Sequence, residues 1–131
     1  MQIQGLDHVV LIARDVQVTA DFYARVLGMR VDVHEDPGHT FHYAEMYFGS
    51  QKINVHQAGR EFEPKALLPT PGSADLCFVT TASPEEVMQH LQACGVTILE
   101  GPVPRVGAHG QMTSIYFRDP DQNLLELAYY A

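Results

Sequence analysis

The sequence predicts an α+β fold made of two paired βαβββ modules that form a cleft between two curved mixed sheets. Two observations favour this fold. The order strand–helix–strand–strand–strand occurs twice along the chain, and neither half is long enough to bury a sheet face alone. A stretch rich in proline and glycine separates the halves. We therefore expect a single domain of 131 residues, with module one at 1–57, a linker at 58–73 and module two at 74–131.

Module one begins with a predicted strand at 5–13, where β-branched and other apolar residues dominate. Asp15 is suited to cap the start of a helix, and apolar residues then recur at helical spacing as far as Gly28, which ends the helix. The remaining apolar runs of this module predict three strands, at 29–33, 41–48 and 52–56.

Module two repeats the order, with a first strand at 74–80. Ser83, Pro84 and Glu86 stand at the N-cap, N1 and N3 positions of a capping box, so a helix is predicted from there to Gly95. Three more strands are predicted, at 96–99, 113–117 and 124–129, with a turn around Pro120 before the last one.

Composition excludes several classes of partner. The net charge is −8, with eight lysine and arginine residues and no basic run, so nucleic acid and anionic membrane are poor partners. No apolar run reaches the roughly 20 residues that span a bilayer, and no signal-peptide pattern opens the chain, so a cytoplasmic location is expected. The two cysteines, Cys77 and Cys94, lie in apolar runs and are expected to be buried, reduced thiols.

Four polar residues lie in otherwise apolar strands near matching places of the two modules. They are His8 and His56 in module one, and Asp75 and Glu126 in module two. A polar group in such a strand is costly unless it is paired or coordinated. Two imidazoles with one or two carboxylates suit a divalent ion of Ni, Zn, Co, Mn or Fe. We therefore expect a metal held by His8, His56 and Glu126, with Asp75 as a candidate fourth ligand.

Other interpretations of these residues stay open. Taken singly, each histidine fits a hydrogen-bonded core or edge position, Glu126 fits a solvent-facing strand position, and Asp75 fits a strand end. Two histidines and one carboxylate also match the non-haem iron pattern. The joint placement at matching positions is what favours a metal site.

Three segments resemble the vicinal oxygen chelate (VOC) superfamily, the group of glyoxalases, bleomycin resistance proteins and extradiol dioxygenases. They are LDHVVL at 6–11, DFYARVLGM at 21–29 and FRDPDQNLLE at 117–126. Segments 51–56, 61–66, 71–76 and 100–105 are similar to a branch of glyoxalase-domain proteins that includes bacterial virulence proteins and is widely labelled lactoylglutathione-lyase-like.

The resemblance implies a metal-dependent lyase or isomerase, working as a homodimer on a hemithioacetal such as a glutathione adduct or on another small vicinal-oxygen substrate. It places the metal ligands at His8, His56, Asp75 and Glu126 and makes Glu126 the catalytic base. Bacterial glyoxalase I has His, Glu, His and Glu at these four places, so the ligand set departs from that pattern. Two alternatives remain: an iron-dependent extradiol-type dioxygenase, and a non-catalytic protein that binds a small molecule or antibiotic.

Overall fold

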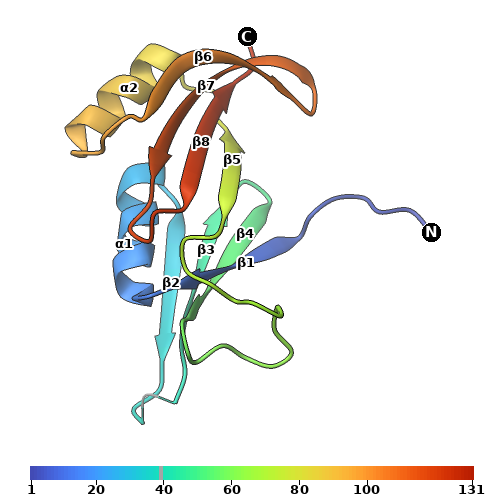
Figure 1. Ribbon diagram of the computed structural model, residues 1–131, viewed down its shortest axis with the longest axis vertical. Helices are drawn as coiled ribbons and strands as arrows, with labels where there is room; N and C mark the ends of the chain where they lie inside the picture. The colour runs from blue at the N-terminus through green and yellow to red at the C-terminus, as the bar shows by residue number, and fades with distance from the viewer. Residues whose placement is uncertain (39) are drawn as a thin grey trace. The chain divides into compact units, whose positions relative to one another are not determined.

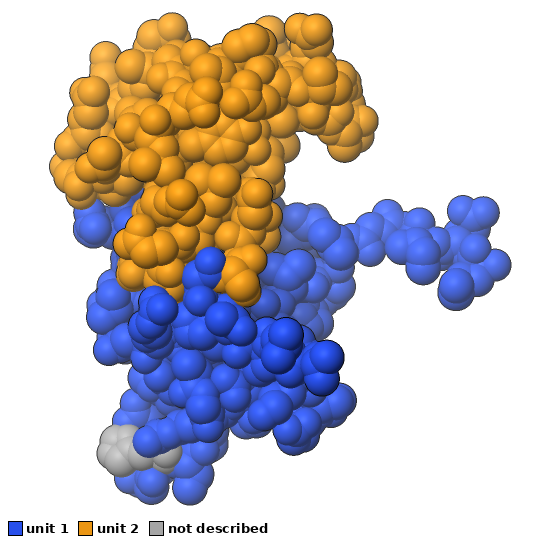
Figure 2. Space-filling view, in the orientation of Figure 1, with its two compact units in different colours: residues 1–72 blue, residues 73–131 orange. Residues whose placement is uncertain are grey.

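The computed structural model describes residues 1–38 and 40–131 and divides into two compact units, 1–72 and 73–131 (Figure 2). Each unit contains a four-stranded mixed sheet and a helix (Figure 1). The predicted α+β class and the two βαβββ modules are therefore confirmed. In the described part of the chain, neither helix is long and apolar enough to cross a membrane.

Unit 1 has the sheet order β1-β4-β3-β2, with β1 and β4 parallel and the other pairs antiparallel. Helix α1 begins where predicted, because the Asp15 side chain accepts a hydrogen bond from the Val18 N–H at 3.1 Å, and it ends before Gly28, whose φ is +68°. The elements are β1 (His8–Ala13), α1 (Val16–Leu27), β2 (Arg30–Glu35), β3 (His42–Phe48) and β4 (Gln51–Gln57).

The two faces of the unit 1 sheet differ in character. One face packs against α1, whose Tyr23 is fully buried, and supplies the core with side chains that alternate along β1, β3 and β4: Leu11, Ala44, Met46, Ile53 and Val55. The opposite face, called here the polar face of unit 1, bears the residues between them. Both predicted histidines of this module, His8 and His56, lie on the polar face.

Unit 2 has the matching sheet order β5-β8-β7-β6. The predicted capping box is present, since the Ser83 hydroxyl accepts a hydrogen bond from the Glu86 N–H at 3.2 Å. Buried Val87 and Leu91 face the sheet from α2. The elements are β5 (Asp75–Val79), α2 (Pro84–Ala93), β6 (Glu100–Gly107), β7 (Gly110–Arg118) and β8 (Leu124–Tyr129).

The strand predicted at 96–99 is wrong, because the strand after α2 is β6 and begins at Glu100. Pro102 and Pro104 lie within β6. Proline lacks the N–H that a central strand needs, but β6 is the edge strand of its sheet and pairs only with β7. An edge position therefore explains why the segment is a strand in spite of its prolines.

The turn before β8 is held by one buried carboxylate, that of Asp119. Its Oδ1 accepts hydrogen bonds from the N–H groups of Asp121 and Asn123 at 2.9 and 3.0 Å, and its Oδ2 accepts one from the Asn123 side-chain amide at 2.8 Å. The Asn123 Oδ1 in turn accepts from the Ala74 N–H at 2.9 Å. The turn thus connects the start of β8 to the start of β5 and fixes their register.

Gln122 occupies the left-handed position of this turn, with φ of +71°. Glycine adopts that conformation without the Cβ clash, so Gln122→Gly is expected to stabilise the folded chain by about 0.5–1 kcal/mol. The Arg118 hydrogen bond to the carbonyl of residue 122, at 3.1 Å, does not need the side chain and is retained. Urea unfolding of the two proteins checks this, and a lower urea midpoint for the variant would contradict it.

Candidate functional site

The polar face of unit 1 bears His8 and His56 but does not bring them together. His8 pairs with Lys52, whereas His56 pairs with Ile12, four residues further along β1. At about 3.3 Å per residue, the two histidines are roughly 13 Å apart along the strands. A zinc-type ion lies about 2.0–2.1 Å from each ligating nitrogen. The register therefore gives no support to His8 and His56 as two ligands of one ion.

His8 lies beside the carboxylate of its neighbour in the sequence, Asp7. Its Nδ1 lies 2.8 Å from a carboxylate oxygen of Asp7, and its side chain is 40% exposed. A carboxylate on one ring nitrogen fixes the ring and leaves the other nitrogen, here Nε2, to an ion.

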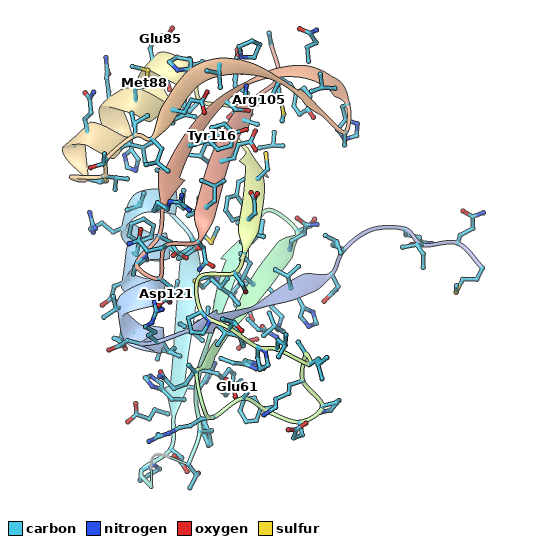
Figure 3. The ribbon with its side chains drawn as sticks, viewed as in Figure 1. Glu61, Glu85, Met88, Arg105, Tyr116 and Asp121 are labelled. Carbon is cyan, nitrogen blue, oxygen red and sulfur yellow. The ribbon has the colours of Figure 1, made fainter. Side chains whose placement is uncertain are left out.

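In unit 2, Asp75 and Glu126 lie on one face of the sheet. Asp75 pairs with Leu124, so Glu126 is two positions further along the neighbouring strand. Both residues line a hollow of about 460 Å³ that also includes Arg105 and Tyr116, the two labelled residues whose side chains lie close together in Figure 3. The structure therefore brings the two carboxylates of module two to the same hollow.

The two registers correct the alignment of the modules. If His8 and Asp75 are equivalent, their strand partners Lys52 and Leu124 are equivalent too. Glu126, two residues after Leu124, then corresponds to Asn54 and not to His56. Sequence reasoning missed Asn54, because its equivalence to Glu126 follows only from strand pairing. The sequence does show, by the alternation along β4, that Asn54 lies on the same face as His56.

Asn54 and Glu126 share a second property that supports their equivalence. The Asn54 Oδ1 and the Glu126 Oε2 are both buried, and neither has a hydrogen-bond partner in the part of the chain that the structure describes. Glu126 is 8% exposed. A buried oxygen without a partner costs about 1–3 kcal/mol, and more when the group is charged.

Glu126 lies between two side chains on the neighbouring strands, Cys77 of β5 and Tyr116 of β7. Desolvation of its sulfur, followed by the negative charge of Glu126, raises the pKa of Cys77 to about 11. Cys77 is exposed as a residue, so the prediction that it is buried is wrong. Cys94 is half-buried, and its Sγ lies 3.6 Å from the Nε2 of His90. Burial also raises the pKa of the Tyr116 phenol.

A second polar cluster on the unit 1 face centres on Glu45. Its carboxylate accepts hydrogen bonds from Lys52 at 2.8 Å and from Tyr47 at 3.0 Å, and its other oxygen lies 3.0 Å from the His34 Nε2. The hydrogen bond from Lys52, followed by that from Tyr47, lowers the pKa of Glu45 to about 2. Every oxygen of this carboxylate has a protein partner, so the cluster is structural.

Glu45→Gln is expected to lower the free energy of unfolding at pH 7 by about 1–2 kcal/mol, after allowance for solvent screening. The folded pKa of Glu45 lies below its ordinary value of 4.5, so this stabilisation is present above pH 4.5 and is lost as the pH falls to about 2. Urea unfolding between pH 7 and pH 2 checks the difference between the two proteins. A difference that stays constant down to pH 2 would contradict the account.

His56 lines a different hollow, of about 340 Å³, between β1, β4 and the segment after β4. Phe62 from that segment contacts the His56 ring edge-to-face at 5.1 Å. Burial is the largest effect on His56 and lowers its pKa, so the ring is neutral at pH 7. Glu61 fixes the segment, because its Oε2 accepts a hydrogen bond from the Gly59 N–H at 2.8 Å (labelled in Figure 3).

In residues 1–38 and 40–131, no three His, Cys, Asp or Glu side chains lie close enough together to hold a metal. Unit 1 has His8 at the start of β1 and the buried Asn54 Oδ1, which has no partner among the described residues. Unit 2 has Asp75 at the start of β5 and the buried Glu126 Oε2, which has no partner there either.

Comparison with known proteins agrees with the repeat and the motifs. Residues 5–127 match the family model of the Glyoxalase/Bleomycin resistance protein/Dioxygenase superfamily. The chain is 52% identical to the glyoxalase domain-containing protein RDO1 of Mycosarcoma maydis, over 99% of this chain and 70% of that protein. It is 46% identical to virulence protein STM3117 of Salmonella typhimurium, over 99% of this chain and 87% of that protein.

Two solved structures have the same fold at high sequence identity. The crystal structure of STM3117 matches with a TM-score of 0.89 over the full length of both chains. The integron cassette protein VCH_CASS1 of V. cholerae, 49% identical, also matches with a TM-score of 0.89, over 100% of this chain and 98% of that one. The chain therefore belongs to the glyoxalase/bleomycin resistance protein/dioxygenase (VOC) superfamily, in the branch that includes the virulence protein and RDO1.

Proposed function

We propose that this protein is a metal-dependent VOC enzyme that isomerises a small substrate with two neighbouring oxygens, such as the hemithioacetal of glutathione and a 2-oxoaldehyde. The observation that supports this most is the Oε2 of Glu126, which is buried and has no partner among the described residues. A buried carboxylate oxygen in this state is suited to bind a cation or to accept a proton.

We propose His8 and Glu126 as the principal ligands of the ion, and Asp75 and Asn54 as its two further ligands. The sequence-based set had His56 in place of Asn54. The four-residue separation of His8 and His56 along the polar face favours Asn54 over His56 as a ligand. Metal titration of the Asn54→Ala and His56→Ala variants distinguishes the two residues. One histidine with oxygen ligands suits Ni, Co, Mn, Fe or Zn.

When bound, a divalent ion acts as a Lewis acid for negative charge on the substrate oxygens. Glu126 acts as the base: its carboxylate accepts the proton from the carbon that bears oxygen and sulfur, and the same proton returns to the neighbouring carbonyl carbon. The hydroxyl proton on the first carbon passes to the oxygen of the second carbon, so the step is a redox-neutral isomerisation from hemithioacetal to thioester.

The protein loaded separately with Ni, Co, Zn or Mn, and mixed with methylglyoxal and glutathione, tests this proposal. We expect thioester formation with at least one metal, and its loss after treatment with a chelator. The absence of thioester with every metal would reject the lyase activity.

A non-catalytic role in binding a small molecule is the second candidate, favoured by the hollow of about 340 Å³ in unit 1. It predicts that His8→Ala and Glu126→Ala leave ligand affinity unchanged. The extradiol alternative needs two histidines on one iron, and the register of β1 and β4 does not favour it.

We also propose that the chain functions as a homodimer. Leu67 and Leu68, in the segment after β4, are 94% and 79% exposed, which is unusual for adjacent leucines. Sedimentation equilibrium is expected to give twice the mass of the chain for the wild type, and a smaller mass for Leu67→Ser/Leu68→Ser. A wild type that sediments as a monomer at micromolar concentration would contradict this.

A further inference from the structure

We propose that the hollow of unit 1 binds a small uncharged molecule that has a flat apolar ring and one hydroxyl group, with the hydroxyl group held by the imidazole of His56. The hollow has a volume of about 340 Å³, which is within the roughly 300–1,000 Å³ of ligand sites in proteins. This inference rests on the second candidate function, the binding of a small molecule in this hollow, and names the chemical class of that molecule. It requires no metal ion.

The walls of the hollow come from two parts of unit 1. The polar face supplies Val10 and Ile12 of β1 and His56 of β4, and the segment after β4 supplies the opposite side. Besides Glu61 and Lys65, the residues of that segment at the hollow are apolar: Phe62, Pro64, Ala66 and Pro69. Aromatic and proline rings are flat and rigid, so these walls favour a ligand with a flat ring.

Phe62 is the aromatic wall of the hollow. Its ring contacts those of His56 at 5.1 Å and Tyr43 at 5.4 Å, edge to face in both cases, and His56 and Tyr43 are directly paired between β4 and β3. Phe62 is nevertheless 42% exposed, and Val10 is 49% exposed. Apolar surface is therefore left uncovered on residues of both walls, and an apolar ring that covers it is stabilised by the hydrophobic effect.

His56 supplies the hydrogen-bonding group of the hollow. Burial lowers the pKa of its ring, and a neutral imidazole has one N–H donor and one acceptor nitrogen. Neither nitrogen has a hydrogen-bond partner in residues 1–38 and 40–131. A hydroxyl group on the ligand can donate to one nitrogen or accept from the other, so it satisfies His56 while its ring contacts the apolar walls.

The charged groups at the hollow already have partners. The Lys65 Nζ lies 3.8 Å from a carboxylate oxygen of Glu61 and 3.4 Å from one of Glu63. Glu61 also accepts a hydrogen bond from the Gly59 N–H at 2.8 Å. A charged ligand would lose its water on entry without gaining an unpaired counter-charge, and that loss is costly. The hollow is therefore suited to an uncharged ligand.

Fluorescence titration of the full chain with four naphthalene compounds tests the inference. Naphthalenemethanol, ethylnaphthalene, naphthoate and naphthylmethylammonium share one ring system and differ in their hydroxyl, methyl, carboxylate and ammonium groups. The chain has no tryptophan, so the naphthalene emission is observed without tryptophan background. We expect naphthalenemethanol to bind most tightly. Ethylnaphthalene should bind about 3–10-fold more weakly through the loss of one hydrogen bond, and each charged compound at least about 10-fold more weakly.

Three variants locate the ligand. His56→Leu removes both ring nitrogens and is expected to weaken the binding of naphthalenemethanol by about 3–10-fold, with ethylnaphthalene changed by less than about two-fold. The matched control is His90→Leu, the same change at an exposed position of α2, and it is expected to bind as the wild type does. Ala66→Phe places a ring in the hollow from the exposed segment and is expected to weaken all four compounds by more than about 10-fold.

The outcomes separate the inference from the function on which it rests. Tighter binding of either charged compound than of naphthalenemethanol, or an unchanged affinity of His56→Leu for naphthalenemethanol, would overturn the inference and leave small-molecule binding intact. Binding that survives Ala66→Phe would also overturn it, since the ligand would then lie outside the hollow. A wild type that binds none of the four compounds would overturn both. Circular dichroism checks the folding of each variant, and if His56→Leu does not fold, Ala66→Phe and the order of the four affinities decide.

Discussion

Replacing Glu126 by Gln is expected to remove tight binding of a divalent ion. The loss in affinity should exceed the roughly 10–100-fold that is typical of groups which only orient a ligand. Glutamine keeps the shape of the side chain and removes its charge, and the buried Oε2 has no protein partner to lose in the described chain. The metal-free variant is therefore expected to unfold at the same urea concentration as the metal-free wild type, or at a higher one.

The control for this prediction is Glu85→Gln, on the exposed side of α2 in the same unit (Figure 3). It makes the same change in charge and is expected to leave metal affinity unchanged. Isothermal titration with Ni(II) measures both variants. Equal affinities for Glu126→Gln and the wild type would show that this carboxylate is not a ligand.

Replacing Asp119 by Ala is expected to destabilise the chain by about 2–4 kcal/mol. The change removes the acceptor of three hydrogen bonds and leaves two buried N–H groups and the Asn123 amide without it. Each such loss costs about 1–3 kcal/mol, reduced where water can enter. Because Asn123 also bonds the Ala74 N–H, the change weakens the connection between β5 and β8. Urea unfolding followed by circular dichroism measures the effect.

Asp21→Ala is the matched control for Asp119→Ala. Asp21 lies on the exposed side of α1, where its carboxylate accepts one hydrogen bond from the Gln17 side chain at 2.9 Å. Its loss is expected to cost less than about 0.5 kcal/mol. A similar loss of stability in both variants would mean that the turn before β8 has no special structural role.

The sequence predicted the elements whose signals are local. Asp15 and Ser83 cap the two helices as expected, and β8 has the predicted bounds, 124–129. The strand predicted at 96–99 is wrong, since β6 begins at Glu100 and holds Pro102 and Pro104 at an edge of its sheet. Whether a strand lies at an edge depends on its neighbours in the sheet and not on its own residues.

The candidate site was predictable only in part, because register is not a local property. The sequence identified His8, Asp75 and Glu126 from polar residues in apolar strands. It aligned His56 with Glu126, and the pairing of β4 with β1 moves that equivalence two residues, to Asn54. Tyr116 was missed for the same reason, since only the pairing of β7 with β8 places it beside Glu126.

The metal content of the purified wild-type chain tests the central claim most directly. After incubation with Ni(II), Co(II), Zn(II) or Mn(II) and removal of free metal by gel filtration, elemental analysis should find one ion per chain for at least one of these metals. The Glu126→Gln variant, treated in the same way, should retain almost none. A wild type that retains no more metal than this variant would contradict the account of Glu126 as a metal ligand.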